Sequence, residues 1–322
     1  MAGTAPERRD GPLAARLAKG RPLLLDAAMG TDLDRRGVTT TLPLWSAVGL
    51  LDAPGTVLRI HVENLAAGAD VVTTNTFRTT GRTLRAAGRD PAEGPDLTRR
   101  AVALAREARQ VADRPDALVA GSIAPLEDCY SPWLAPAADV ARREHAEQAS
   151  ALADAGADFL MVETMPGIGE AVAALAAARA TGLEATVGFV CAPPEAGGRV
   201  RLLSGETLAA AVRAVEPLGP SAILVNCSAP AVIDAALAVL RGLTDLPVGG
   251  YANLGRVDPV RGWEPDASVP GEAFAADAER WLERGATIVG GCCGTHPEHT
   301  RALRALLDRR WSGANDPTAS SC

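Results

Sequence analysis

The sequence predicts an α/β protein that folds as a single (β/α)₈ TIM barrel. Eight apolar runs rich in β-branched residues recur at fairly even spacing along the 322 residues. Segments with helical periodicity lie between them, and most of these end at a glycine just before the next apolar run. A strand followed by a helix, repeated eight times, is the pattern of this barrel. The length would also allow two domains, but single barrels reach it as well.

The eight apolar runs are expected to form parallel strands. Continuous apolar runs of this length are typical of strands that are buried on both faces of a parallel sheet. Most of them follow a turn that contains Gly-Ala, Gly-Leu or proline. The predicted strands span residues 21–28, 69–77, 117–125, 157–166, 185–191, 222–228, 247–253 and 286–293.

The segments between these runs are rich in Ala, Leu, Arg and Glu, and their apolar residues can form one stripe on a helix. The predicted helices span residues 54–69, 97–112, 140–157, 169–182, 205–219, 229–243, 271–286 and 297–310. The alternative, a doubly wound open sheet, would need a glycine-rich dinucleotide turn after its first strand. The sequence there, "DAAMGTD" at 26–32, is not G-x-G-x-x-G, so the barrel is favoured.

The barrel domain is expected to span residues 21–310, between a flexible leader (1–20) and a flexible tail (311–322). The net charge of −7 argues against binding to nucleic acid or to an anionic membrane. No stretch has the apolar length of a signal peptide or a membrane span, so we expect a cytoplasmic protein. Its six cysteines are then thiols or ligands rather than a disulfide framework. The oligomeric state is left open.

Three longer polar stretches, residues 129–139, 191–201 and 254–270, follow the C-terminal ends of predicted strands. That end of a barrel carries the active site, so we expect these stretches to be site-forming loops. The only lysine, Lys19, lies ahead of the first strand, which argues against a lysine Schiff base.

Polar residues inside the apolar runs provide a test of the barrel, because they should gather at one end of the strands if that end is a site. Nine of them lie late in their runs and would converge on one mouth of the barrel. Asp26 and Glu163 among them could be structural partners of loop amides or arginines, or could bind an ammonium group. The late polar residues are Asp26, Asn75, Thr76, Glu163, Asn226, Cys227, Asn253, Cys292 and Cys293.

Cys227, Cys292 and Cys293 come from the ends of two predicted strands and could hold Zn²⁺ with one tetrahedral position open, the arrangement of a catalytic zinc. Adjacent side chains of a regular strand point to opposite faces, so Cys292 and Cys293 can share a metal only if the strand ends irregularly. Gly290, Gly291 and Gly294 provide the necessary backbone freedom. On spacing alone, a zinc site and three buried thiols remain equal alternatives.

The remaining cysteines and the histidines of "HPEH" have simpler interpretations. Cys191 is expected to be a small buried hydrophobe, and Cys129 and Cys322 to be loop and tail thiols. His296 and His299 are expected to face solvent at the start of the last helix.

Five ordered motifs make the chain resemble the zinc-dependent homocysteine S-methyltransferase family from about residue 20 to 310. They are "LLDAAMGTDLDRRG", "TTNTFRTT", "EHAEQASALADAGADFLMVETMP", "VNCSAP" and "GGCCGTHPEH". The resemblance implies a homocysteine-binding barrel with Zn²⁺ on Cys227, Cys292 and Cys293. It also implies that homocysteine bound to the zinc through its thiol accepts a methyl group and becomes methionine.

The resemblance also implies roles for residues around the metal. The Asp26–Thr31 loop, through Gly30 and Thr31, would hold the amino-acid end of the acceptor, with Glu163 at its ammonium. Trp45 would face the cationic methyl donor or be an ordinary loop aromatic. The asparagines at the strand ends, Asn75, Asn226 and Asn253, complete the residues expected to bind substrate.

The partners implied are a small thiol acceptor and a small methyl donor. One barrel leaves no room for folate or cobalamin domains, so S-methylmethionine is our first choice of donor, S-adenosylmethionine the second and betaine the third. Ala27, Leu254 and Arg256 depart from the family pattern and leave the donor and even the acceptor open. Rival interpretations are another thiol acceptor, a zinc hydrolase and a non-catalytic zinc or thiol sensor.

Overall fold

The computed structural model describes residues 11–195, 197–258 and 262–312, and within them eight parallel strands form one sheet. The sheet order is β1-β10-β7-β6-β5-β4-β3-β2, and β1 meets β2 through a parallel bridge between Leu25 and Val71. The sheet therefore closes on itself, and the predicted barrel is confirmed. Its strands are β1 (Leu23–Leu24), β2 (Val71–Thr73), β3 (Leu118–Ile123), β4 (Phe159–Met165), β5 (Ala185–Phe189), β6 (Ala222–Asn226), β7 (Val248–Ala252) and β10 (Ile288–Gly291).

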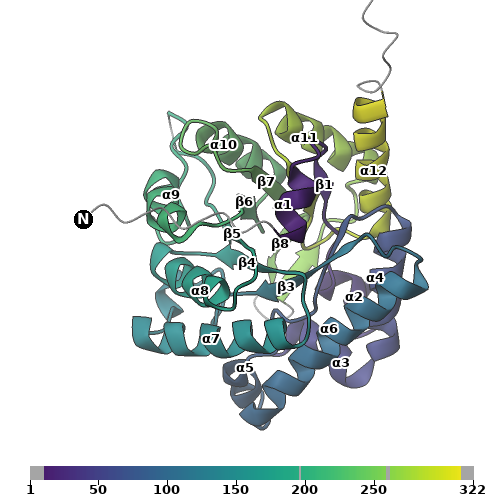
Figure 1. The fold of residues 1–322 in the computed structure, drawn as a ribbon, viewed down its shortest axis with the longest axis vertical. Coiled ribbons are helices and arrows are strands. Elements are labelled where there is room, and N and C mark those ends of the chain that lie inside the picture. The colour runs from purple at the N-terminus through teal and green to yellow at the C-terminus, as the bar shows by residue number, and fades with distance from the viewer. Residues whose placement is uncertain (1–10, 196, 259–261, 313–322) are drawn as a thin grey trace, which may run out of the picture.

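The eight predicted helices are present and surround the strands (Figure 1). One of them, predicted from 205, begins only at Leu208, because the Thr207 side chain accepts a hydrogen bond from the amide of Ala210 and caps the helix there. The helices are α4 (Pro54–Ala66), α6 (Gly94–Val111), α7 (Ala138–Asp154), α8 (Ile168–Ala180), α9 (Leu208–Val215), α10 (Pro230–Leu240), α11 (Gly271–Glu283) and α12 (Pro297–Ser312).

The leader was expected to be flexible, and this is wrong for its described part. Residues Pro12–Leu17 form helix α1, whose Leu13 is buried against the N-terminal ends of the strands. The carboxylate of Glu184, directly before β5, accepts hydrogen bonds of 2.8 Å from the amides of Leu13 and Ala14. These contacts hold α1 across the N-terminal end of the barrel. Residues 1–10 and the tail beyond 312, including Cys322, lie outside the described residues.

Short elements that the sequence analysis did not predict lie mostly in the segments that follow strands. They are α2 (Gly30–Arg35), α3 (Val48–Asp52), α5 (Gly81–Ala86), the antiparallel pair β8 (Gly255–Asp258) and β9 (Gly262–Pro265), and four single-turn 3₁₀ segments. All but one lie between a strand and the helix that follows it, and α2, β8 and β9 contribute residues to the site described below. The exception is the 3₁₀ turn Glu216–Leu218, which lies between α9 and β6.

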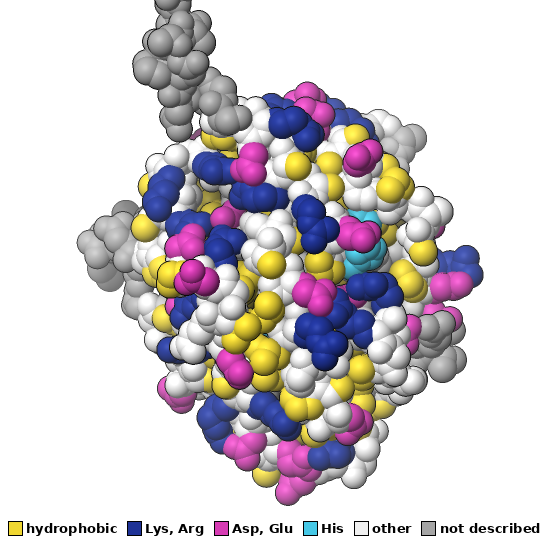
Figure 2. All heavy atoms as spheres, turned by 90° about the vertical axis from the view of Figure 1, so that its right-hand side faces the viewer, with side chains coloured by type: hydrophobic (Ala, Val, Ile, Leu, Met, Phe, Trp, Pro, Cys, Tyr) yellow, Lys and Arg dark blue, Asp and Glu magenta, His cyan; other side chains and the backbone are white. Residues whose placement is uncertain are grey.

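On the side of the molecule where α12 and α4 lie, basic side chains stand beside acidic ones, and hydrophobic side chains are scattered between them (Figure 2). Within the described part of the chain, no helix has the length and apolar character needed to cross a membrane.

Candidate functional site

The sulfurs of Cys227, Cys292 and Cys293 meet at the C-terminal mouth of the barrel, and all lie within 4.8 Å of one another. Cys227 directly follows β6, and the other two directly follow β10. Both strands stop before the cysteines, and the backbone then turns, with φ of 47° at Cys227 and 85° at Gly294. A Cβ at residue 294 would lie 1.8 Å from the carbonyl oxygen of Leu254, so only glycine allows this turn. The irregular strand end that the sequence required is present.

In the absence of a cation, the pKa of each of the three thiols is raised, so all three are protonated near neutral pH. The hydrogen bond with Cys292 and burial raise the pKa of the Cys227 thiol well above its usual range. The hydrogen bond with Cys227 and burial do the same for the pKa of Cys293. A metal ion in their midst would replace these protons and bind three thiolates. The cluster can therefore hold a soft metal ion, with release of protons.

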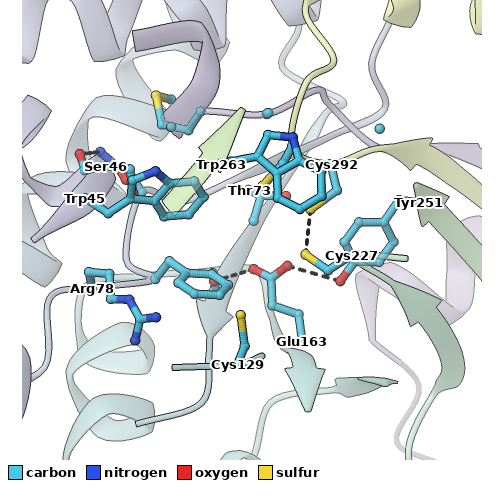
Figure 3. A pocket seen from close by; sticks show the side chains of 18 of the residues that line it. Trp45, Ser46, Thr73, Arg78, Cys129, Glu163, Cys227, Tyr251, Trp263 and Cys292 are labelled. Carbon is cyan, nitrogen blue, oxygen red and sulfur yellow. Dashed lines mark hydrogen bonds between the residues drawn. The ribbon is translucent and has the colours of Figure 1, made fainter. Parts of the chain in front are cut away.

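Two buried carboxyls, Glu163 and Asp26, lie beside the sulfurs and have no arginine or lysine partner among the described residues. Glu163 accepts hydrogen bonds from the hydroxyls of Ser122 and Tyr251, and burial raises its pKa to about 7 (Figure 3). Asp26 accepts hydrogen bonds of 2.9 Å from the amide and the hydroxyl of Thr73. Burial, aided by the nearby Glu163, raises the pKa of Asp26 to about 7. A cationic group of a ligand would complete this pair.

The sulfurs and carboxyls open into one cavity of about 410 Å³. Two aromatic pairs contribute to its walls. The rings of Trp45 and Phe77 meet edge to face at 5.7 Å, and those of Tyr130 and Trp263 stack at 6.1 Å. In Figure 3, the rings of Trp45 and Trp263 lie above the Glu163 carboxyl. Arg78 is the only arginine or lysine among the described residues that line the cavity.

The predicted site residues divide into two groups. Asp26, Gly30, Trp45, Asn75, Glu163 and the three cysteines line the cavity. Thr31, Asn226 and Asn253 are not among the residues that line it. Their side chains instead hold the strand ends. Thr31 accepts a hydrogen bond from the amide of Gly294, and Asn253 accepts one from the amide of Cys293. Asn226 binds the backbone and the hydroxyl of Thr164.

Two of the three predicted site loops contribute residues to the cavity. Residues 129–139 contribute Tyr130 to the cavity, and residues 254–270 contribute Trp263. Residues 191–201 contribute no lining residue in their described part. This stretch folds back on itself, with the amide of Ala192 bonded to the carbonyl of Arg201.

Three further expectations can be compared with the structure. Cys191 is a buried residue beside the sheet, as predicted. Cys129 is not a plain loop thiol, because it is buried in the cavity wall, where burial raises its pKa to about 12. His299 does not face solvent, because its ring packs edge-on against Phe274 and it accepts a hydrogen bond from the amide of His296.

The positions that depart from the family pattern also have defined places. Arg256 is exposed and pairs with Glu264, so it meets solvent rather than the cavity. Leu254 is buried, and its amide binds the carbonyl of Cys293 at 2.7 Å. Ala27 lines the cavity, and its amide binds the side chain of Asn64.

Sequence reasoning missed Arg78, Tyr130, Tyr251 and Trp263 as lining residues. Arg78 follows strand β2 within the quoted motif "TTNTFRTT", and Tyr251 is the one aromatic residue of the seventh strand. Tyr130 and Trp263 are aromatic residues in loops that were expected to form the site. The presence of large side chains in those places could have identified them.

Known proteins resemble this chain over nearly its whole length. The family model described as Homocysteine S-methyltransferase matches residues 23–307. A homocysteine S-methyltransferase of Escherichia coli (strain K12) is 34% identical over 92% of this chain and 99% of its own length. A selenocysteine methyltransferase of Astragalus bisulcatus is 29% identical over 94% of this chain and 96% of its own. The crystal structure of the homocysteine methyltransferase MmuM from Escherichia coli, in its metallated form, superposes with a TM-score of 0.77 at 32% identity, covering 92% and 99% of the two chains.

Proposed function

Because the chain belongs to the homocysteine S-methyltransferase family, we propose that it transfers a methyl group from a sulfonium donor to homocysteine held on Zn²⁺, giving methionine. One observation carries the proposal. Three thiols converge beside two buried carboxyls that have no arginine or lysine partner among the described residues, and all five groups face one cavity. The thiols suit a metal that binds sulfur, and the carboxyls suit the ammonium group of an amino acid.

Cys227, Cys292 and Cys293 would hold the zinc. A tetrahedral zinc ion about 2.3 Å from each sulfur needs sulfurs about 3.8 Å apart. The three Sγ atoms lie within 4.8 Å of one another, but those of Cys227 and Cys292 are 2.9 Å apart, so this pair would have to separate by about 0.9 Å when the metal binds. When bound, zinc lowers the pKa of a thiol that takes its fourth position, so that the thiol is a reactive thiolate near neutral pH. The similar protein MmuM was solved in a metallated form, which supports metal binding by a chain of this family.

Asp26 and Glu163 would bind the acceptor's ammonium, which orients its thiol toward the three cysteines. An ammonium between them favours their ionised forms and would lower both pKa values from about 7. The acceptor thiol would release its proton to solvent as it binds, and its sulfur lone pair then forms the new bond to the methyl carbon. The donor sulfur keeps the electron pair of the bond that breaks and leaves as a neutral thioether. The buried walls exclude water, which would compete for the methyl group.

The donor would lie between the aromatic pairs and Arg78. A sulfonium carries positive charge that an aromatic face such as that of Trp45 attracts. Nε of Arg78 is buried and has no hydrogen-bond partner among the described residues, and we propose that this side chain receives the donor's carboxylate. S-methylmethionine, with a sulfonium and a carboxylate, is the first choice, ahead of S-adenosylmethionine and then betaine.

A different acceptor is the second candidate function. Two of the similar proteins are named as methyltransferases of selenocysteine, whose selenol is softer and more acidic than a thiol. A non-catalytic metal sensor is disfavoured, because it would not need two carboxyls placed beside the metal cluster.

The test uses reduced, zinc-loaded protein with homocysteine and, in turn, S-methylmethionine, S-adenosylmethionine and betaine. Methionine is quantified by mass spectrometry, and selenocysteine replaces homocysteine in a parallel series. Methionine from S-methylmethionine at the highest rate is expected. Faster methylation of selenocysteine would move the acceptor to the second candidate, and no product in either series would refute the proposed reaction.

A further inference from the structure

Strand β4 contains a bulge directly beside the three cysteines. Its pairing with β5 shifts register between Val162 and Met165, and the residue inside the bulge, Thr164, has a φ of 61°. A β-branched residue rarely adopts this left-handed conformation, and surrounding contacts must maintain it. Bulges next to active sites commonly redirect side chains. Here the bulge lets Glu163 face the cavity while its neighbour Thr164, fully buried, contacts Cys227.

The direction of the Thr164 hydroxyl proton is set by Asn226. The amide nitrogen of the Asn226 side chain donates to Oγ1 of Thr164 at 2.7 Å, so this oxygen is the acceptor in that contact. The side-chain oxygen of Asn226 accepts from the backbone amide of Thr164 at 2.9 Å, which fixes the orientation of the amide group. The hydroxyl proton is therefore available to Sγ of Cys227, 3.3 Å away.

Neighbouring backbone makes room for this arrangement. A Cβ on Gly188 of β5 would lie 2.8 Å from the side-chain oxygen of Asn226, so a larger residue there would displace the asparagine. Among the described residues, no hydroxyl donates to the sulfur of Cys292 or Cys293. Cys227 is thus the one member of the cluster with a directed hydroxyl donor.

We propose that Thr164, oriented by Asn226, is a positioning residue that donates a hydrogen bond to the Cys227 thiolate and so stabilises the metal-bound form of the cluster. The inference rests on the proposed zinc site. A hydrogen bond to a thiolate withdraws electron density from the sulfur, and partners of metal ligands commonly change metal affinity 10- to 100-fold.

The test measures metal binding rather than turnover. Thr164→Val keeps the branched shape and removes the hydroxyl. Thr164→Gly also removes the hydroxyl but suits the left-handed backbone, which protects the test against misfolding of the valine variant. Thr164→Ser retains the hydroxyl. Thr186→Val is the matched control, because Thr186 is a buried threonine of the neighbouring strand whose hydroxyl has no partner among the described residues.

Zinc affinity is measured by chelator competition, and the thiolate-to-metal charge-transfer band is recorded with Co²⁺ in place of zinc. We expect Thr164→Val and Thr164→Gly to weaken zinc binding roughly 10-fold or more and to move the band to longer wavelength. Thr164→Ser and Thr186→Val should stay close to wild type. Unchanged affinity and band in both hydroxyl-free variants, or an equal loss in Thr186→Val, would overturn the inference.

The same measurements separate the two proposals. Wild-type protein that binds neither metal would refute the proposed function and this inference with it. Wild-type protein that binds metal but forms no methylated product would refute the reaction alone, and the comparison of variants would still decide the role of Thr164.

Discussion

The two ends of the barrel each carry a cavity of about 410 Å³. They differ in whether the carboxylates beside the cavity are paired with arginines. At the N-terminal end, Asp70 pairs with Arg16 at 3.1 Å and with Arg304 at 3.4 Å, and it accepts a hydrogen bond from the amide of Leu24. At the C-terminal end, Asp26 and Glu163 have no arginine or lysine partner among the described residues. His61 lies 4.0 Å from Asp26, but burial lowers its pKa to about 4, so it is neutral. A carboxylate that is already paired gains little from a ligand, whereas a buried unpaired one gains much.

The backbone differs in the same way. Among the described residues, four that are not glycine have a positive φ, and Trp45, Thr164 and Cys227 of these lie at the C-terminal mouth. The fourth, Asp113, lies in a turn after α6, and aspartate tolerates that conformation. Unusual conformations gather where side chains must be aimed at a ligand. One end of the barrel is therefore arranged for stability and the other for binding.

Removal of one cysteine ligand should have the largest effect. Cys227→Ser is expected to lose stoichiometric zinc and to lower methyl transfer by more than about 100-fold, since loss of a ligand should exceed loss of its supporting hydrogen bond. Metal content by mass spectrometry and the rate of methionine formation check this. Cys191→Ala is the control, because Cys191 is buried outside the cluster and should leave zinc bound. Full activity in Cys227→Ser would refute the metal site.

Glu163→Gln should have the next largest effect, because it removes a charge but keeps the shape. We expect kcat/KM for homocysteine to fall roughly 10- to 100-fold, the value of a hydrogen bond to a charged group, while zinc stays bound. Steady-state kinetics with varied acceptor measure it. An unchanged KM for the acceptor would show that the ammonium binds elsewhere.

Glu163→Gln also tests whether the buried Glu163 carboxyl makes the free energy of unfolding depend on pH. The pKa of Glu163 is raised from 4.5 to about 7 in the folded protein. Between these pH values, the Glu163 carboxyl is protonated in the folded protein but ionised in the unfolded chain. Stability from this group is complete below pH 4.5 and is lost as the pH rises through 7, by about 3 kcal/mol in total. Urea unfolding of the metal-free proteins from pH 5 to 8 measures the free energy of unfolding of wild type and of Glu163→Gln. The wild-type value minus the variant value should fall over this range. Parallel curves would contradict it.

The difference between the ends also explains how far the sequence could predict the site. The mouth was predictable because Asp26 and Glu163 fall late in their apolar runs, and the C-terminal ends of parallel strands meet at one end of a barrel. The hydrogen bonds that Thr31, Asn226 and Asn253 make to the strand ends could not be predicted, because their partners lie in distant segments of the sequence and depend on strand register. The bulge at Thr164 has no local sequence mark. Helix α1 has Pro12 at its start, but the residue that caps it, Glu184, is 171 positions from Leu13.

Arg78→Met should have a smaller effect, confined to the donor. We expect the KM of the methyl donor to rise roughly 10-fold, the value of one charge-assisted hydrogen bond, with the KM of homocysteine unchanged. Arg82→Met is the matched control, because Arg82 pairs with Glu127 and Glu144 outside the cavity lining. Equal kinetics in both variants would remove Arg78 from donor binding.

Asp70→Asn should have the smallest effect on turnover and a clear effect on stability. It removes the charge that pairs with Arg16, Arg114 and Arg304, while the asparagine can still accept from the amide of Leu24. Because these groups are partly exposed, we expect a loss of about 2 kcal/mol in the free energy of unfolding rather than the larger cost of a fully buried pair. Kinetics of the folded protein should match wild type with both substrates. The two carboxyl variants thus predict opposite outcomes: Glu163→Gln impairs acceptor binding and stabilises the protein at high pH, whereas Asp70→Asn destabilises it and leaves binding intact. A raised acceptor KM in Asp70→Asn would show that the N-terminal end of the barrel also supports substrate binding. It would contradict the view that the two ends act independently.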